Sequence, residues 1–419
     1  MKVSLLVLAI AALLMTPTAA FGRRPPANND PGPPAVLWYA PFLSGGGYCS
    51  EAHSYVVAVD AALTISSVSS STTSSQNEPE SSQDTEIDSP HGDSLNPAFI
   101  RDLPEDMKAK LEQHWIEERD FYWRVGACTL HDVPLSAAGA LYKVGRTMFE
   151  TDRVPKGWSD RMNKMDEIWV PTKFQEKIFV DGGVRPEAVK VVPEVVDVDF
   201  FDPDKVEQVY DLVSETAFDM TEKTTVYLSI FKWEERKAWR VLLKAYFQAF
   251  KAEDDVVLVL LTNGYHTTSS SADDFMNVID KFAAADAFVL PSRGEGWGRP
   301  HVEAMAMERP VIATFWSGTT EYMTEKNSYP LKIDGLIEIT DGAFRGHMWA
   351  DPSVEHLKEL LLWIKEHPKD AVAKGKQARK DMVDKYSPEI IGEIVLGHIS
   401  RILEHVAAQE EAAAAHEEL

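Results

Sequence analysis

Short apolar runs alternate with longer amphipathic stretches along most of the chain. A strand buried on both faces shows a continuous apolar run, whereas a covering helix shows apolar residues every three or four positions. The alternation therefore predicts an α/β protein whose sheets are mainly parallel. Predicted strands lie at residues 35–40, 127–130, 224–231, 256–261, 287–290 and 310–315, with two shorter ones ending at Pro171 and Pro193; predicted helices lie at about 49–62, 111–122, 239–250, 356–367, 371–386 and 388–406.

The clearest alternation lies at residues 284–307. Residues 287–290 are a strand-like apolar run, and Pro300 stands where the first turn of a helix tolerates proline. Glu303 falls early in that helix, where the helix dipole favours a carboxylate. Between strand and helix lies a segment that we call the glycine loop, residues 291–298, in which glycine lets a ligand approach the backbone closely. Its glycines are Gly294, Gly296 and Gly298.

Glu295 in this loop and Glu303 in the following helix have seven residues between them. This spacing, set between an apolar strand and the Ser/Thr-rich run at 313–321, resembles the E-x7-E signature of glycosyltransferase family 4. The resemblance implies the GT-B fold, two Rossmann-like α/β/α lobes that face each other across a cleft. It also implies that Glu295 and the loop backbone hold the sugar of a nucleotide-sugar, while Glu303 holds the ribose. Ionised carboxylates suit this task because they are strong acceptors for hydroxyl groups.

Further residues fall at positions that the resemblance links to the donor. Lys232 and Lys237 stand five positions apart, where two cations would bind a diphosphate and stabilise it as it leaves; a solvated charge run is the alternative. His131 follows a predicted strand and would position the sugar, although a lone histidine is more often structural. Glycine after the first strand indicates a nucleotide-binding turn or simply a tight turn, and the amides that open a helix after residue 315 are a plausible diphosphate cradle. These positions are Gly46 and Gly47, and Ser317, Gly318 and Thr319.

Composition and pattern divide the chain into segments. A Pro-rich linker, a Ser/Thr/Glu-rich insertion and an Ala/Glu-rich tail separate or interrupt the regions that carry the strand and helix patterns. The predicted segments are a leader at 1–22, a linker at 23–34, an N-terminal acceptor-side lobe at 35–205 with the insertion at 66–88, a C-terminal nucleotide-sugar-binding lobe at 206–388, a return helix at 389–406 and an acidic tail at 407–419.

Two positions depart from the family pattern. Between Leu261 and Ala284 the family has another strand and loop, which recognise the base, and here a Ser/Thr/Asp-rich run at 267–274 takes their place. Glu308 stands where the family favours glycine. A charged run at 142–153, which resembles a plant and bacterial branch of the family, is either a surface ion-pair network or part of an acceptor site.

Charge, length and cysteine content limit the number of domains, the kinds of binding partner and the compartment that we expect. The 419 residues allow two or three domains, and the net charge of −24 argues against a nucleic-acid or anionic-membrane partner. Residues 1–22 resemble a secretory leader with an apolar run too short for a comfortable membrane span, and no later run predicts an integral span. The two cysteines, Cys49 and Cys128, allow one disulfide or two buried thiols. Residues 416–419, His-Glu-Glu-Leu, resemble an endoplasmic-reticulum retrieval signal, and with the leader they predict a soluble protein of that lumen.

With the resemblance, these features predict a retaining glycosyltransferase of the hexosyltransferase type, which moves a sugar from a nucleotide-sugar to a hydroxyl group of a glycan, glycoprotein or lipid. The mechanism usual in the family needs no metal and no cofactor, and no His/Asp/Cys cluster has metal-ligand spacing. Two alternatives stay open. One is another GT-B enzyme, such as a phosphorylase or an epimerase. The other is a non-catalytic sugar- or nucleotide-sugar-binding protein descended from a transferase, which the departure after Leu261 would suit.

Overall fold

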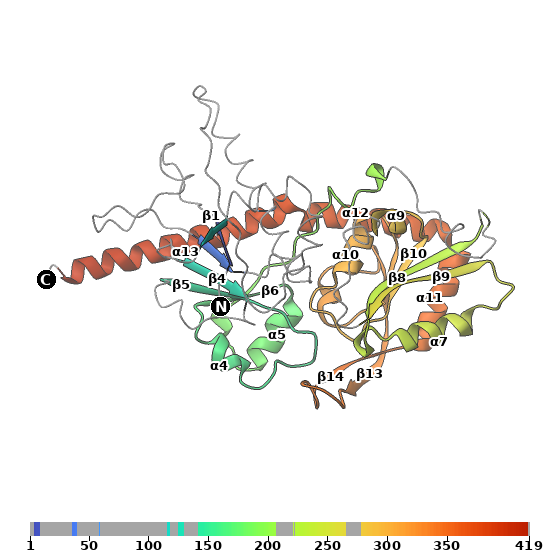
Figure 1. Cartoon of the computed structure of the whole chain (residues 1–419), viewed down its shortest axis with the longest axis horizontal. Helices are drawn as coiled ribbons and strands as arrows, with labels where there is room; N and C mark the ends of the chain where they lie inside the picture. The colour runs from blue at the N-terminus through green and yellow to red at the C-terminus, as the bar shows by residue number, and fades with distance from the viewer. Residues whose placement is uncertain are drawn as a thin grey trace, which may run out of the picture.

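The computed structural model of the chain describes residues 141–206, 221, 223–264 and 278–417, together with Ala58 and the backbone of four strands nearer the N-terminus. It contains a larger sheet in an N-terminal lobe and a five-stranded sheet in a C-terminal lobe (Figure 1). Helices flank both sheets, and most strand pairs are parallel. The predicted α/β class is therefore confirmed. The helix predicted at 49–62, apart from Ala58, and the insertion predicted at 66–88 lie outside the described residues, as does Cys49.

The N-terminal sheet has the strand order β3–β1–β2–β4–β5–β6–β7. Neighbours from β2 to β7 are parallel, whereas β1 pairs antiparallel with β2 and β3. β1 lies within the predicted leader, whose cleavage stays a prediction. The helix predicted at 111–122 is wrong over β3, where Trp and Ile favour a strand. The elements are β1 Ser4–Leu8, β2 Val36–Tyr39, β3 Trp115–Glu117, β4 Val125–Thr129, β5 Tyr142–Arg146, α4 Trp158–Met162, β6 Glu167–Val170, α5 Lys173–Asp181, η3 Pro186–Ala188 and β7 Val189–Val191.

The C-terminal sheet is parallel throughout, in the order β12–β11–β10–β8–β9. Four predicted strands are confirmed as β8 to β11. Within the described residues β9 is an edge strand, and residues 265–277, where the sequence departs from the family, lie outside them. The elements are η4 Pro203–Lys205, β8 Thr225–Trp233, η5 Glu235–Lys237, α7 Trp239–Ala249, β9 Val256–Gly264, α9 Val278–Ala283, β10 Ala287–Leu290, α10 Arg299–Ala306, β11 Val311–Thr314, η6 Ser317–Glu321, β12 Tyr329–Leu331, α11 Val354–Glu366 and α12 Pro368–Tyr386.

Glu308 directly follows Met307, the residue that caps the C-terminus of α10. Its φ angle is +57°, in the left-handed region that glycine enters without steric cost. This conformation gives the physical reason why glycine is favoured at this position, and it means that the chain carries a strained glutamate there.

A hairpin that the sequence analysis did not predict follows the C-terminal sheet. It pairs β13 (Ile333–Glu338) with β14 (Met348–Pro352) in antiparallel fashion. Its second strand contacts the N-terminal lobe: the Asp152 amide donates to the Met348 carbonyl at 3.0 Å, and the Met348 amide donates to Oδ1 of Asp152 at 2.7 Å. Thr151 Oγ1 lies 2.8 Å from Nδ1 of His347, and the rings of Phe149 and Phe344 pack edge to face. The hairpin therefore bridges the two lobes.

Helix α13 (Pro388–Glu417) leaves the C-terminal lobe and runs across the N-terminal lobe (Figure 1). There Arg401 pairs with Glu167 of β6 at 2.7 Å, and His398 packs against Trp169. The return helix predicted at 389–406 is confirmed, but the tail predicted at 407–419 continues it as helix to Glu417, exposed from residue 407 to residue 416, because alanine and glutamate are strong helix formers. Of the helices in the described ranges, none is both long and apolar enough to cross a membrane.

Candidate functional site

The glycine loop joins β10 to α10 and is buried along its whole length. Gly298 adopts a φ of +102° immediately before the helix. A Cβ atom at Gly294 would lie 2.2 Å from the carbonyl oxygen of Glu150 in the N-terminal lobe, and one at Gly318 would lie 2.3 Å from the carbonyl oxygen of Gly296. Glycine at 294 and 318 therefore permits close packing of protein backbone, in addition to any approach of a ligand.

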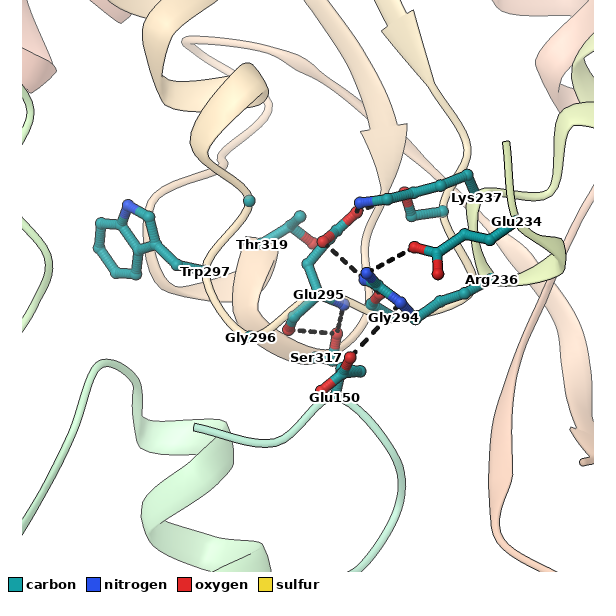
Figure 2. A network of polar contacts seen from close by, with 12 residues as sticks. Glu150, Glu234, Arg236, Lys237, Gly294, Glu295, Gly296, Trp297, Ser317 and Thr319 are labelled. Carbon is teal, nitrogen blue, oxygen red and sulfur yellow. Dashed lines mark hydrogen bonds and ion pairs between the residues drawn. The ribbon is translucent and has the colours of Figure 1, made fainter. Parts of the chain in front are cut away.

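Glu295 is the centre of a buried polar network (Figure 2). Its Oε1 accepts from Nζ of Lys237 at 2.5 Å and from Oγ of Ser292 at 2.6 Å, while its Oε2 accepts from Arg236 at 2.9 Å. Burial alone would raise the pKa of Glu295, but Lys237 and Arg236 hold it well below its usual range. Glu295 is thus a fixed anion with three hydrogen-bond donors already in place.

The two cations of this network come from η5, directly after β8. Lys237 is buried, and burial together with the neighbouring charge of Arg236 lowers its pKa. Arg236 pairs with three carboxylates: Glu234 at 2.7 Å, Glu295 at 2.9 Å and Glu150 of the other lobe at 3.4 Å. Burial alone would lower the pKa of Arg236. The three carboxylates outweigh this effect and raise its pKa above the usual value. The network therefore joins a basic pair, a fixed anion and the opposite lobe.

Lys237 shares Glu295 with Arg236 and not with Lys232, and a contact of Lys232 with a diphosphate stays a prediction. Lys232 is exposed on β8, and it is Arg236 that lies beside Lys237 against Glu295. The reason is that β8 does not end at Phe231, as predicted, but continues through Trp233 in register with β9. The sequence signal for Arg236 is its place beside Lys237, within six residues that also include Lys232.

Ser317, Gly318 and Thr319 open η6 and are buried, but the structure uses them to support the glycine loop. The Gly318 amide donates to the carbonyl oxygen of Glu295 at 3.0 Å. Ser317 Oγ accepts from the Glu295 amide at 2.8 Å, and Thr319 Oγ1 donates to the carbonyl of Thr314 at 2.6 Å. The prediction that these groups cradle a diphosphate is corrected for the Gly318 amide, since a protein oxygen already occupies it.

Glu303 lies on α10, one helical turn after Arg299. Oε1 of Glu303 is 3.5 Å from Nε of Arg299, whose Nη1 is 3.7 Å from Oε2 of Glu194. Burial raises the pKa of Glu303, and Arg299 opposes that rise. Glu295 and Glu303 are therefore both present near the helix start as predicted, but they have different partners and opposite pKa shifts.

The N-terminal lobe contacts the glycine loop through Gln175 of α5. This buried side chain donates to the carbonyl of Gly296 at 2.5 Å and to that of Phe149 at 3.3 Å. The charged run at 142–153 is likewise mostly internal: Arg146 donates to the carbonyl of Val192, and Glu150 pairs with Arg236. The interpretation of this run as a surface ion-pair network is wrong for the buried Arg146, whereas Arg153 pairs with Asp152 at the surface at 2.6 Å. An acceptor role stays a prediction.

Three predicted site residues, His131, Gly46 and Gly47, lie outside the described residues. Within the described ranges no group of three or more His, Cys, Asp or Glu side chains is arranged to hold a metal ion. Conversely, Arg236 and Ser292 were missed as site residues, as were Gln175 and, except as part of the charged run at 142–153, Glu150. The last two come from the other lobe, and no spacing in the sequence connects them with Glu295.

Comparisons with known proteins find related sequences and similar folds. Residues 222–338 match the profile of the family described as "Glycosyl transferases group 1". A GDP-mannose-dependent monoacylated alpha-(1-6)-phosphatidylinositol monomannoside mannosyltransferase from Corynebacterium glutamicum is 27% identical over 223 residues, which are 48% of this chain and 53% of that protein. The chain thus spans about half the length of this curated relative.

Solved structures show the same architecture. A glycosyltransferase from Rickettsia africae ESF-5 is similar with a TM-score of 0.54 at 13% identity, over 89% of this chain and 97% of that one. HepE from Anabaena, solved with UDP and glucose, is similar with a TM-score of 0.50 at 13% identity, over 66% of this chain and 78% of that one. At such identities the likeness concerns the fold, and it confirms the predicted GT-B architecture.

Proposed function

We propose, from the group 1 glycosyltransferase domain formed by residues 222–338, that this protein is a retaining glycosyltransferase of the hexosyltransferase type. The donor is a nucleoside diphosphate sugar, and the acceptor is a hydroxyl group of a glycan or glycoconjugate. The relatives support this class of donor, since one is named as GDP-mannose-dependent and another was solved with UDP and glucose.

One observation carries the proposal: two basic side chains at the carboxyl end of a parallel strand, held in place by a buried anion. Lys237 and Arg236 both contact Glu295, directly after β8. Ligands of open α/β sheets bind outside the carboxyl ends of the strands. Preformed cations at such an edge suit a diphosphate, which gains negative charge as the bond to the sugar breaks.

The cluster of Glu150, Glu234, Glu295, Arg236 and Lys237 has three carboxylates for two cations. A diphosphate would add negative charge, so one carboxylate partner of Arg236 must be given up when the donor binds. Glu150 is the partner that leaves, because its contact of 3.4 Å is the longest and it belongs to the other lobe. Donor binding is then coupled to the contact between the lobes.

In the proposed reaction the bond between the anomeric carbon and the diphosphate oxygen breaks. The acceptor oxygen bonds to that carbon on the same face, and the acceptor proton passes to a phosphate oxygen of the leaving group. Arg236 and Lys237 stabilise the departing diphosphate, and Glu303 accepts hydrogen bonds from the ribose. Glu295 orients the two cations through its hydrogen bonds with them. The backbone of the glycine loop, in which Glu295 lies, holds the sugar. This sequence needs no protein nucleophile, metal or cofactor.

The first test is binding and transfer by the purified protein. In thermal-shift measurements, UDP-glucose or GDP-mannose should raise the melting temperature of the protein. Incubation with the radiolabelled donor and a mixture of glycan acceptors should then give a labelled product. Proton NMR of the new linkage should show the same anomeric configuration as the donor. An inverted linkage would contradict the mechanism, and the absence of stabilisation across a full nucleotide-sugar set would contradict the function.

The second test uses single substitutions. Lys237→Ala should lower kcat/KM by roughly 10- to 1000-fold, the range expected when a charge-stabilising group is lost. Lys232→Ala is the comparison, and an equal loss there would restore the pairing that the sequence alone suggested. Glu303→Gln should mainly raise the donor KM, since ribose binding is similar in the ground and transition states. Glu295→Gln should mainly lower kcat, because the two cations lose their shared anion.

A non-catalytic binding protein is the second candidate. The departure from the family after Leu261, in the region linked to base recognition, favours it. Nucleotide-sugar binding by calorimetry with neither transfer nor donor hydrolysis over a day would support this alternative over the enzyme.

A further inference from the structure

We infer that Arg299 is a positioning residue for the ribose of the donor: it holds the Glu303 carboxylate in its ionised form and in a fixed orientation, while Glu194 anchors Arg299 from the other side. This inference rests on the proposed function and concerns a residue outside the E-x7-E pair. It also predicts how the protein distinguishes a ribonucleotide from a deoxyribonucleotide.

The geometry is a bridge of one guanidinium between two carboxylates. Arg299 Nε lies 3.5 Å from Glu303 on the next turn of α10, and Arg299 Nη1 lies 3.7 Å from Glu194 in the segment after β7. All three side chains are shielded from solvent, with exposed fractions of 19% for Arg299, 13% for Glu303 and 2% for Glu194. A guanidinium offers five N–H donors on three nitrogen atoms in one plane, which allows it to contact both carboxylates at once.

The anchor side of this bridge is itself fixed. Shortly after Glu194, the Val196 amide donates to the carbonyl of Tyr386 at 2.8 Å. Further on, Arg379 of α12 donates to the carbonyls of Val198 and Phe201 at 2.8 and 2.6 Å. The segment that carries Glu194 is therefore held against the C-terminal lobe, so Arg299 is oriented from a stable point.

The charge balance explains why Glu303 needs this support. Glu303 is buried on α10, where burial favours its neutral form and Arg299 is the cation that opposes it. Burial also raises the pKa of Asp197, which lies in the same segment as Glu194, and the charge of Arg299 opposes that rise. The guanidinium therefore interacts with three acidic groups, those of Glu303, Glu194 and Asp197. An ionised carboxylate accepts hydrogen bonds from two ribose hydroxyls, whereas a protonated one has turned one of its oxygens into a donor. Loss of Arg299 should therefore weaken recognition of the ribose in particular.

The experiment compares ribose with deoxyribose. Calorimetric titrations of UDP, GDP and their 2′-deoxy forms are made with the full-length protein and with Arg299→Gln, Arg299→Lys and Arg309→Gln. Arg309 is the matched control, since it follows the other end of α10 and donates to the carbonyls of Met307 and Ala285. We expect the wild type to prefer the ribonucleotide by about tenfold, the discrimination of one hydrogen bond to a charged group. Arg299→Gln should reduce that preference below roughly threefold, Arg299→Lys should be intermediate, and Arg309→Gln should retain it.

A pH series separates positioning from a general structural role. In Arg299→Gln the affinity for the ribonucleotide should rise with pH more steeply than in the wild type, because burial raises the pKa of Glu303 and the variant lacks the cation that opposes this rise. An unaltered ribose preference in a folded Arg299→Gln protein, with a wild-type pH profile, would overturn the inference. Failure of the wild type to bind any member of a full set of nucleoside diphosphates and nucleotide-sugars would refute the proposed function itself. If Arg299→Gln does not fold, the ribose preference of Arg299→Lys decides.

Discussion

His301 makes a prediction about acid stability that can be worked through in numbers. The residue lies on α10 with no exposed surface, and its Nδ1 is 3.2 Å from the carbonyl oxygen of Gly298, to which the ring N–H donates. Within the described residues its Nε2 has no hydrogen-bond partner. Burial lowers the pKa of His301 from 6.5 to about 4, and Lys237 adds to that effect while Glu295 opposes it. Protonation of His301 is therefore disfavoured in the folded protein.

The sign of the effect follows from proton uptake. Below pH 6.5 the unfolded chain gains a proton at this histidine, whereas the folded chain stays neutral until about pH 4. Stability is therefore unaffected above the unfolded pKa and falls between pH 6.5 and about 4. With a gap of about 2.5 pKa units the loss is about 2 kcal/mol at pH 5 and about 3 kcal/mol at pH 4.

The assay is denaturation by urea at pH 7.5 and pH 5.0, followed by circular dichroism, for the wild type and for His301→Asn. Asparagine keeps a side-chain N–H for Gly298 but has no ionisable group. The wild type should lose about 2 kcal/mol more than the variant between the two pH values. His347, His356 and His398 also have lowered pKa values through burial, but they are present in both proteins and cancel in the difference. Equal losses in the two proteins would refute the reasoning.

Three further predictions concern other parts of the molecule. Glu308→Gly should raise the free energy of unfolding by about 1 kcal/mol, because it relieves a φ of +57°, and an unchanged melting temperature would argue against strain there. Glu150→Gln should tighten donor binding by up to about fivefold in calorimetry, since Arg236 no longer has to release a carboxylate; weaker binding would contradict the coupling of donor and lobes. Arg401→Ala should destabilise the fold by about 2 kcal/mol, because the nearly buried Glu167 loses its cation, and Arg401→Lys should restore most of that in thermal unfolding.

The core of the site could be predicted from the sequence because its signals are local. The apolar run at Ala287–Leu290, the glycine loop and the proline at the start of α10 determine strand, loop and helix within a short stretch, and all three are confirmed. Glu295 and Glu303 were identified by the same spacing. Their partners depend on other segments: whether Lys232 or Arg236 faces Glu295 is decided by the length of β8, which its pairing with β9 extends.

The bridging hairpin and the helical tail were missed for different reasons. The hairpin of β13 and β14 is stabilised by contacts with Phe149, Thr151 and Asp152, and no pattern within 333–352 reveals partners so distant in the chain. The tail was described by its acidic and alanine-rich composition alone. The helix propensity of the same residues predicts the extension of α13 to Glu417 that is observed.

The path of α13 has a consequence for the order in which the protein can be made. Glu167 of β6 is translated well before Arg401, the cation that pairs with it, because Arg401 lies 234 residues further along the chain. While the C-terminal lobe is still being translated, the first lobe therefore lacks a helix and carries a carboxylate without its partner. Folding domain by domain from the ribosome cannot finish the first lobe first. A chimaera that exchanges lobes between related proteins would have to transfer α13 together with residues 141–206 to keep this pair intact.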